Sequence, residues 1–165
     1  MIEPHLVLNG LSGEDARRAL TRCCGASRWV AGMLARRPFP SAAALYAGAD
    51  EVWTSLARAD FLEAFSHHPQ IGGEGGAPAT ATWSRQEQAA VSDADDRTRI
   101  ALRAGNLAYL RRFGFIYIVC ASGKSGEEML AMLEQRLGHD DARELEVAAG
   151  EQARITRLRL EKLGA

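Results

Sequence analysis

Hydrophobic residues recur along most of this chain at the three- and four-residue spacing of an amphipathic α-helix. Serine residues precede several of these segments and can cap a helix N-terminus, whereas Pro38 and Pro69 mark helix ends because the residue before a proline disfavours helical geometry. No proline follows residue 78, so long helices are possible in the second half of the chain. We expect helices over 12–24 and 27–36, then an alanine-rich helix that Ser41 caps, and further helices over 50–66, 84–103 with a continuation to 112, and 125–137. A last helix begins at Asp140 or Asp141. One stripe of this helix carries Leu145, Ala148, Gln152, Ile155 and Leu158.

Two segments depart from this helical pattern. Residues 72–80 are rich in glycine and cannot hold a regular element, so we expect a flexible loop there. Residues 113–121 are rich in aromatic and β-branched side chains, and their pattern taken alone predicts a strand. Because the sequence offers no second strand to pair with it, we expect a buried extended or short helical piece instead. The predicted fold class is therefore all-α, a single-domain helical bundle that spans residues 1–165.

The composition of the 165-residue chain narrows the classes of function. Lys and Arg number 20 against 21 Asp and Glu, and this net charge of −1 argues against a nucleic-acid partner, because such binding depends on surplus positive charge. The longest apolar run, residues 115–121, has seven residues, whereas a membrane span needs about 20. The N-terminus also lacks the pattern of a signal peptide. We therefore expect a cytoplasmic protein without a membrane partner.

The three cysteines do not indicate a disulfide framework or a metal site. Cys23 and Cys24 are adjacent and Cys120 stands alone, so no paired spacing is present. The cysteine pairs or helically spaced histidines of a structural zinc site are missing as well. We expect all three thiols to be small buried groups in a reducing compartment.

Two polar segments are candidates for proton transfer, and each has a structural alternative. His68 precedes Pro69 at a helix end, where an imidazole suits acid–base chemistry near neutral pH but is also common simply because the helix dipole favours its cation. The run Ser84-Arg85-Gln86-Glu87 matches a capping box, which by itself is structural. A carboxylate at such a helix start is also well placed to accept a proton, and the neighbouring Gln88 offers both a donor and acceptors.

Two further segments are candidates for binding. Residues 113–121 are most simply core, yet an unpaired extended segment must satisfy its backbone N–H groups somewhere, and a polar ligand is one possible partner. Arg159 lies between Leu158 and Leu160 beside the apolar stripe of the last helix. A solvated or ion-paired arginine is the usual outcome at such a position, but its planar fork also suits a carboxylate or a ureido group.

Together these segments resemble the OHCU decarboxylase family, which acts on the route from urate to allantoin. A lone His-Pro pair is no signal, but here the motifs occur in family order across about residues 10–163. They comprise His68-Pro69-Gln70-Ile71-Gly72, the Ser-x-x-Glu-Gln run from Ser84 to Gln88, Asn106, Tyr109, the block from Phe113 to Ala121, Arg136-Leu137, Glu144, and the run from Ile155 to Leu160.

The resemblance implies an all-α enzyme that decarboxylates 2-oxo-4-hydroxy-4-carboxy-5-ureidoimidazoline (OHCU) to (S)-allantoin. It further implies that no metal or organic cofactor is needed, that the partner is a small-molecule substrate, and that the protein forms a homodimer. By position, the catalytic acid–base pair is His68 and Glu87. The implied substrate contacts are Pro69, Ser84, Arg85, Gln86, Gln88, Tyr117, Ile118, Val119, Cys120, Ala121 and Arg159.

The chain departs from the family pattern at three positions, and none of these departures removes a motif residue. Gln70 stands where the family often has an acidic residue, His67 adds a second imidazole beside the first, and Ile116 is often proline in animal relatives. The main alternative function is a helical binding or regulatory module without catalysis. A DNA-binding regulator conflicts with the net charge, and a metal-dependent hydrolase built on His67 and His68 conflicts with the rarity of adjacent histidines on one ion.

Overall fold

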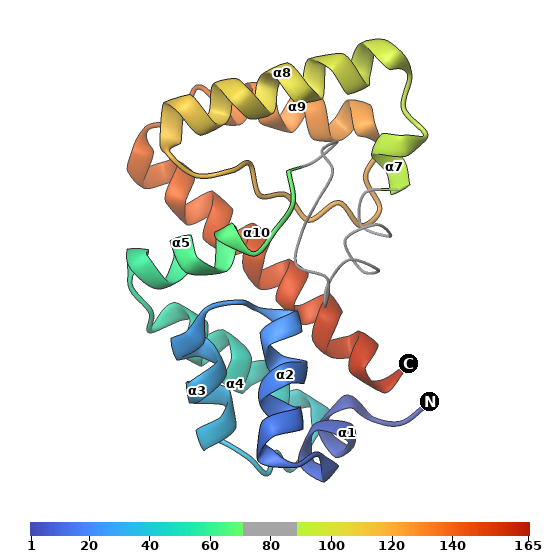
Figure 1. Ribbon diagram of the computed structural model, residues 1–165, viewed down its shortest axis with the longest axis vertical. Coiled ribbons are helices and arrows are strands. Elements are labelled where there is room, and N and C mark those ends of the chain that lie inside the picture. Colours follow the sequence, from blue (N-terminus) through green and yellow to red (C-terminus); the bar gives the residue numbers. More distant parts are fainter. Residues whose placement is uncertain (71–88) are drawn as a thin grey trace. The chain divides into compact units, whose positions relative to one another are not determined.

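A computed structural model of the protein describes residues 1–70 and 89–165 (Figure 1). Every regular element in these ranges is a helix, so the all-α prediction is confirmed for the described part of the chain. None of the described helices combines the length and the low polarity needed to cross a bilayer. The elements are α1 Pro4–Gly10, α2 Gly13–Cys23, α3 Ser27–Ala35, α4 Ala42–Thr54, α5 Arg58–Ser66, α7 Ala89–Ser92, α8 Asp96–Phe113, α9 Gly126–Arg136, α10 Asp141–Glu161 and the 3-10 helix η2 Lys162–Gly164.

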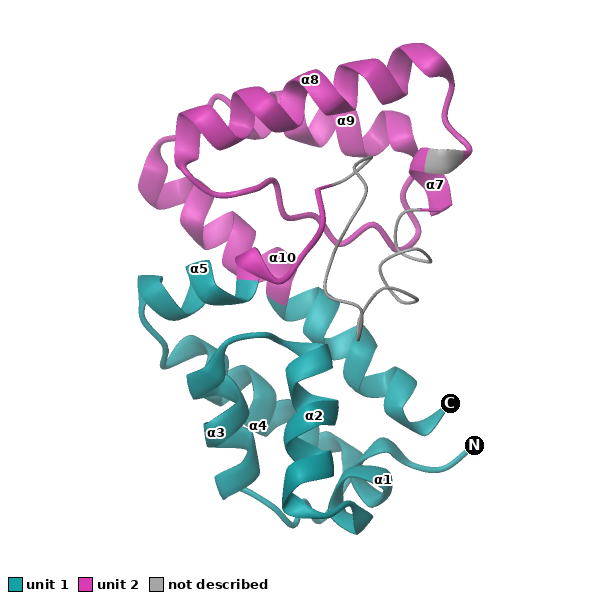
Figure 2. Ribbon diagram, in the orientation of Figure 1, with its two compact units in different colours: residues 1–64, 153–165 teal, residues 65–152 magenta. Residues whose placement is uncertain are grey.

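The chain divides into two compact units (Figure 2). Unit 1 contains residues 1–64 and 153–165, and unit 2 contains residues 65–152. The boundaries fall inside α5 and inside α10, so that residues 141–152 of α10 belong to unit 2 and the rest of that helix belongs to unit 1.

Unit 1 is a cluster of short helices built around fully buried apolar side chains. Helix α3 packs against both α2 and α4, and α1 packs against α2, α4 and η2. The predicted caps are confirmed, because Ser12 and Ser41 each accept a hydrogen bond from the backbone N–H three residues further on. The indole of Trp29 is fully buried in this unit and donates to the Ala49 carbonyl at 3.1 Å. Helix α1 was not predicted, because its seven residues are too few to show a clear period.

Unit 2 pairs α8 with α9 and encloses a buried extended segment. Ser125 caps α9, as the sequence predicted, and the structure shows that it forms a reciprocal capping box with Glu128. Gly114 ends α8 in the left-handed region at φ 80°, a conformation that favours glycine. Beyond it, residues 115–121 run without regular structure and all but Ile116 are buried. The prediction of a buried extended piece is confirmed, and the strand pattern was misleading.

Two of the predicted helices are each divided in the structure, at a point where an aspartate side chain caps the N-terminus of a second helix. The expected helix over 50–66 is wrong, because α4 ends at Thr54 and the Asp60 carboxylate accepts from the Ala57 N–H at 3.0 Å to begin α5. The expected helix over 84–103 is also broken, because Asp95 accepts from the Thr98 N–H at 2.7 Å and begins α8 anew. Residues 84–88 and the predicted loop over 72–80 lie outside the described residues.

Helix α10 begins as predicted, but its buried face is more polar than the predicted stripe. Asp140 accepts from the Arg143 N–H at 2.8 Å and so caps the helix. Ala148, Gln152 and Ile155 of the stripe are buried, whereas Leu145 and Leu158 are only half-buried. Apart from Leu160, the remaining buried positions of this helix carry polar side chains, namely Glu144, Glu151, Thr156 and Arg159.

Candidate active site

His68 lies just after α5, in the turn that ends the helix. Its backbone N–H donates to the Phe65 carbonyl at 3.1 Å, and Pro69 then prevents the helix from continuing. The imidazole is half-buried, and its Nε2 atom lies 2.6 Å from Oε1 of Gln152 on α10. The neighbouring His67 is exposed. Of the two adjacent imidazoles, only that of His68 is held by a buried partner among the described residues.

The extended segment 117–121 presents buried backbone donors. Its residues are between 1% and 6% exposed. Within residues 1–70 and 89–165, no backbone hydrogen bond is donated by the N–H groups of Tyr117, Ile118, Val119 or Ala121. Buried N–H groups in native proteins nearly always have a partner. These donors therefore form a candidate binding surface for the polar oxygens of a ligand.

Side chains from unit 2 hold this segment in place through its carbonyl groups. Nη1 of Arg136 donates to the Ile118 carbonyl at 2.7 Å, and Nζ of Lys124 donates to the Cys120 carbonyl at 2.8 Å. The Tyr117 hydroxyl donates to the Met129 carbonyl at 2.9 Å. Because two of its carbonyls and the Tyr117 side chain are bonded in this way, the segment keeps its extended form without pairing to a strand.

Arg136, which donates to the Ile118 carbonyl, also belongs to a buried ionic cluster around Glu144. The Glu144 carboxylate accepts from Nε of Arg136 at 2.7 Å and from the Tyr109 hydroxyl, and Nδ1 of His139 lies 3.0 Å from its other oxygen. The Arg136 guanidinium also stacks over the Tyr117 ring, 4.7 Å from its centre. Burial alone would lower the pKa of Arg136, but the hydrogen bonds and charge of Glu144 outweigh that and raise it. The Arg136 guanidinium therefore stays charged in its buried position.

An aromatic contact connects the end of α5, just before His68, with the start of the extended segment. The Phe65 ring, one turn before His68, lies 5.3 Å from the Phe115 ring at the start of the segment. Burial raises the pKa of the Tyr117 phenol, and the charge of Glu151, the residue next to Gln152, adds to that rise. The structure thus brings the end of α5, which leads to His68, against the start of the extended segment, although fifty positions separate Phe65 and Phe115 in the sequence.

Arg159 and residues 84–88 are the predicted site residues that remain. Arg159 belongs to unit 1, where it is buried and Nη1 donates to the Arg22 carbonyl at 3.2 Å. Ser84, Arg85, Gln86, Glu87 and Gln88 lie outside the described residues, so the pairing of His68 with Glu87 stays a prediction. Within the described ranges, no three His, Cys, Asp or Glu side chains converge in a way that could hold a metal ion.

Sequence reasoning did not identify the roles of Gln152, Arg136 and Glu144. Arg136 and Glu144 entered only as motif residues of the resemblance, and Gln152 only as a member of the helical stripe. The available signal was that polar residues occupy positions of α9 and α10 that the helical period assigns to the buried face. Buried charged and amide groups require partners, and such positions indicate a polar network.

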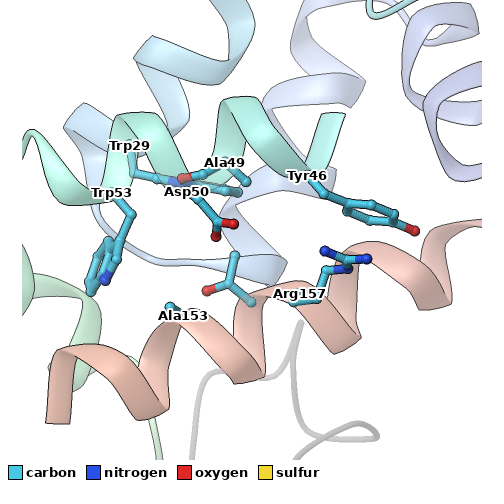
Figure 3. Close-up of a pocket in the computed structure, with 8 residues that line it drawn as sticks. Trp29, Tyr46, Ala49, Asp50, Trp53, Ala153 and Arg157 are labelled. Carbon is cyan, nitrogen blue, oxygen red and sulfur yellow. The ribbon is translucent and has the colours of Figure 1, made fainter. Parts of the chain in front are cut away.

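A surface hollow in unit 1 is lined by none of the predicted site residues (Figure 3). It contains about 250 Å³ of space, part of which is open solvent. The Arg157 guanidinium lies over the Tyr46 ring at 3.5 Å and pairs with Glu161 at 2.9 Å. The lining consists of Trp29, Tyr46, Ala49, Asp50, Trp53, Ala153, Thr156 and Arg157.

Cys23 and Cys24 are expected to resist thiol reagents in the native protein. Both side chains are buried in unit 1, and burial raises the pKa of each thiol to about 12, against the lowering effect of Arg159. At pH 8 both groups are therefore protonated and shielded. Labelling with Ellman's reagent, followed by peptide mapping, should modify them only after the addition of denaturant. Rapid labelling of the native pair would contradict the burial of these thiols.

Comparison with known proteins identifies the family. Residues 9–161 match the family model described as OHCU decarboxylase, which covers nearly the whole chain. The chain belongs to the OHCU decarboxylase family. Two solved structures are similar to this family member. The crystal structure of an OHCU decarboxylase in the presence of (S)-allantoin matches with a TM-score of 0.77 and 36% identity, covering 88% of this chain and 96% of that one.

The second structure, that of an (S)-allantoin synthase, shows the fold alone. Its TM-score is 0.74 and its identity is 15%, and the match covers 100% of this chain and 54% of that one. The likeness extends the OHCU decarboxylase fold to a chain of much lower sequence similarity.

Two curated relatives of this OHCU decarboxylase family member are close in sequence. The uric acid degradation bifunctional protein of Arabidopsis thaliana is 37% identical over 155 residues, covering 92% of this chain and 47% of the relative. The 2-oxo-4-hydroxy-4-carboxy-5-ureidoimidazoline decarboxylase of Amia calva is 33% identical over 132 residues, covering 77% of this chain and 74% of the relative. The chain thus spans about half the length of the plant protein.

Proposed function

We propose that this protein decarboxylates OHCU to (S)-allantoin in the degradation of urate. The observation that carries the proposal is the set of buried backbone N–H groups of Tyr117, Ile118, Val119 and Ala121, in the same unit as the held imidazole of His68. These groups are suited to a small heterocycle with several carbonyl oxygens and a proton to transfer. Family membership supports the substrate class, and the names of the relatives from Arabidopsis and Amia agree with it.

The chemistry of the substrate explains why acid–base groups and hydrogen-bond donors are enough. The C4 carbon carries the leaving carboxylate and a hydroxyl group, and it adjoins a C5=N imine. When the bond to the carboxylate breaks, its electron pair forms a C4=C5 double bond and the imine nitrogen takes a proton. Loss of the hydroxyl proton then gives the C4 carbonyl, and protonation of one face of C5 gives (S)-allantoin. The electron sink is thus part of the substrate.

Each predicted residue has a role in this sequence of steps. His68 lies beside the carboxylate or the developing enamine and assists carbon dioxide loss and proton delivery, while Glu87 takes the proton of the C4 hydroxyl. The N–H groups of residues 117–121 bind the ring carbonyl and ureido oxygens at little reorganisation cost. Arg159 anchors the anionic charge. The remaining substrate contacts in this proposal are Pro69, Ser84, Arg85, Gln86 and Gln88.

The proposal extends to the organisation of the protein. We take residues 1–165 as one functional domain, because the family match from 9 to 161 includes most of both units. A homodimer in the cytoplasm completes the proposal. Light scattering coupled to gel filtration tests the homodimer, which should give twice the mass of the chain, and a monomer at working concentration would contradict it.

Circular dichroism of freshly generated OHCU tests the function directly. We expect the protein to accelerate the appearance of a one-handed allantoin signal, because protonation on a protein surface is confined to one face of C5. A rate and an optical purity equal to those without protein would contradict the enzyme and favour a binding or regulatory module. Unchanged activity in EDTA separates this function from a metal-dependent hydrolase.

A further inference from the structure

The contact between His68 and Gln152 constrains the position of the imidazole proton. Nε2 of His68 lies 2.6 Å from Oε1 of Gln152, a distance at which a hydrogen must lie between the two atoms. An amide oxygen accepts hydrogen bonds and does not donate them. Nε2 is therefore the donor, and a neutral His68 ring carries its lone pair on Nδ1.

The surroundings of Gln152 make this contact a firm one. The Gln152 side chain is fully buried on α10. The backbone of His68 is held by the hydrogen bond from its N–H to the Phe65 carbonyl at the end of α5. A buried amide loses much if its partner is removed, because an unsatisfied polar group is expensive to bury. The amide is also neutral, so it orients the ring without placing a charge beside it.

We infer that Gln152 is a positioning residue: it holds His68 with the proton on Nε2 and presents Nδ1 as the nitrogen that exchanges a proton with the substrate. The exchange at Nδ1 rests on the function proposed above, whereas the ring geometry stands independently of it. The nitrogen that carries the proton in a histidine is decided by the hydrogen bond that the other nitrogen makes. Position 152 therefore needs a side chain that accepts a hydrogen bond from Nε2–H. A side chain of similar shape that cannot accept this bond would not hold the proton on Nε2.

Long-range ¹H–¹⁵N spectra of the histidine rings test the geometry without any substrate. The four histidines are assigned by their substitution, which includes His68→Gln. At a pH where the rings are neutral, wild-type His68 should show a slowly exchanging Nε2–H signal. Gln152→Met, which keeps the length of the side chain but removes the acceptor, should abolish that signal. Gln152→Glu, which keeps an acceptor, should restore it, and Gln135→Met on the exposed face of α9 is the matched control.

Kinetics then separate positioning from a general loss of structure. For Gln152→Met we expect kcat to fall about 10- to 100-fold with little change in KM, because the ring is misplaced while substrate contacts remain. Gln152→Glu should recover part of that loss even if Gln152→Met folds poorly.

Several outcomes would overturn the inference. A wild-type ring with its proton on Nδ1 does so, and so does a Gln152→Met protein that keeps both the Nε2–H signal and its kcat. A wild-type protein that shows the Nε2–H signal but does not convert OHCU contradicts the proposed function and leaves the ring geometry supported.

Discussion

Replacing His68 by alanine is expected to lower the rate of (S)-allantoin formation by about 10²- to 10⁴-fold, the range that a positioned acid–base group contributes. Glu87→Ala should have an effect of the same order, because the two groups manage different protons of one reaction. His68 is half-buried and bonded to the buried Gln152 amide, so its removal should cost about 1–3 kcal/mol of stability and leave a folded protein, in contrast to the loss of turnover. Stopped-flow circular dichroism of OHCU conversion and a thermal melt measure the two quantities.

The neighbouring histidine supplies a control for this experiment. His67→Ala changes an exposed imidazole one residue away and should be milder. If His67→Ala alone abolished activity, the assignment of the catalytic histidine would be wrong. For Glu87 the structural alternative is a helix cap, whose loss would cost about 0.5–2 kcal/mol of stability and spare turnover. Loss of turnover with stability retained would exclude that alternative.

Arg136→Ala should have the largest effect on stability, lowering the free energy of unfolding by about 3–5 kcal/mol. The substitution leaves the Glu144 carboxylate buried without its cation and removes the hydrogen bond to the Ile118 carbonyl. Urea denaturation followed by tryptophan fluorescence measures the loss. As a matched control, Arg18→Ala removes an arginine with a 68% exposed side chain and surface ion pairs, and should cost less than about 1 kcal/mol.

A double replacement distinguishes the two roles of Arg136. Arg136→Met together with Glu144→Leu removes both buried charges, and such apolar replacements often restore stability. We expect the double variant to be more stable than Arg136→Ala but still impaired in turnover, because nothing then holds the Ile118 carbonyl and the extended segment. Full activity in a stable double variant would show that the segment keeps its form without Arg136.

Local signals in the sequence were reliable where the interaction itself is local. The caps at Ser12, Ser41 and Ser125 join residues three positions apart, so the sequence displays both partners. The predicted helix over 50–66 failed because the hydrophobic period continues across a break that the Asp60 side chain decides. Helix propensity alone does not show whether this single hydrogen bond or a continuous helix is more stable.

The sequence by itself determined the all-α class, a buried segment after α8 that pairs with no strand, and the family, because the helical period, the lack of a partner strand and an ordered motif set can be read along the chain. Whether that segment is extended or helical was decided by the tertiary structure, which makes residues 115–121 extended. Only the tertiary structure decided which polar groups meet. Gln152 reaches His68 across 84 positions, and Arg136 reaches the Ile118 carbonyl across 18. A buried polar group needs a hydrogen-bond partner, but the packing of the helices determines which group becomes that partner. The hydrophobic period of a single helix does not predict how the helices pack.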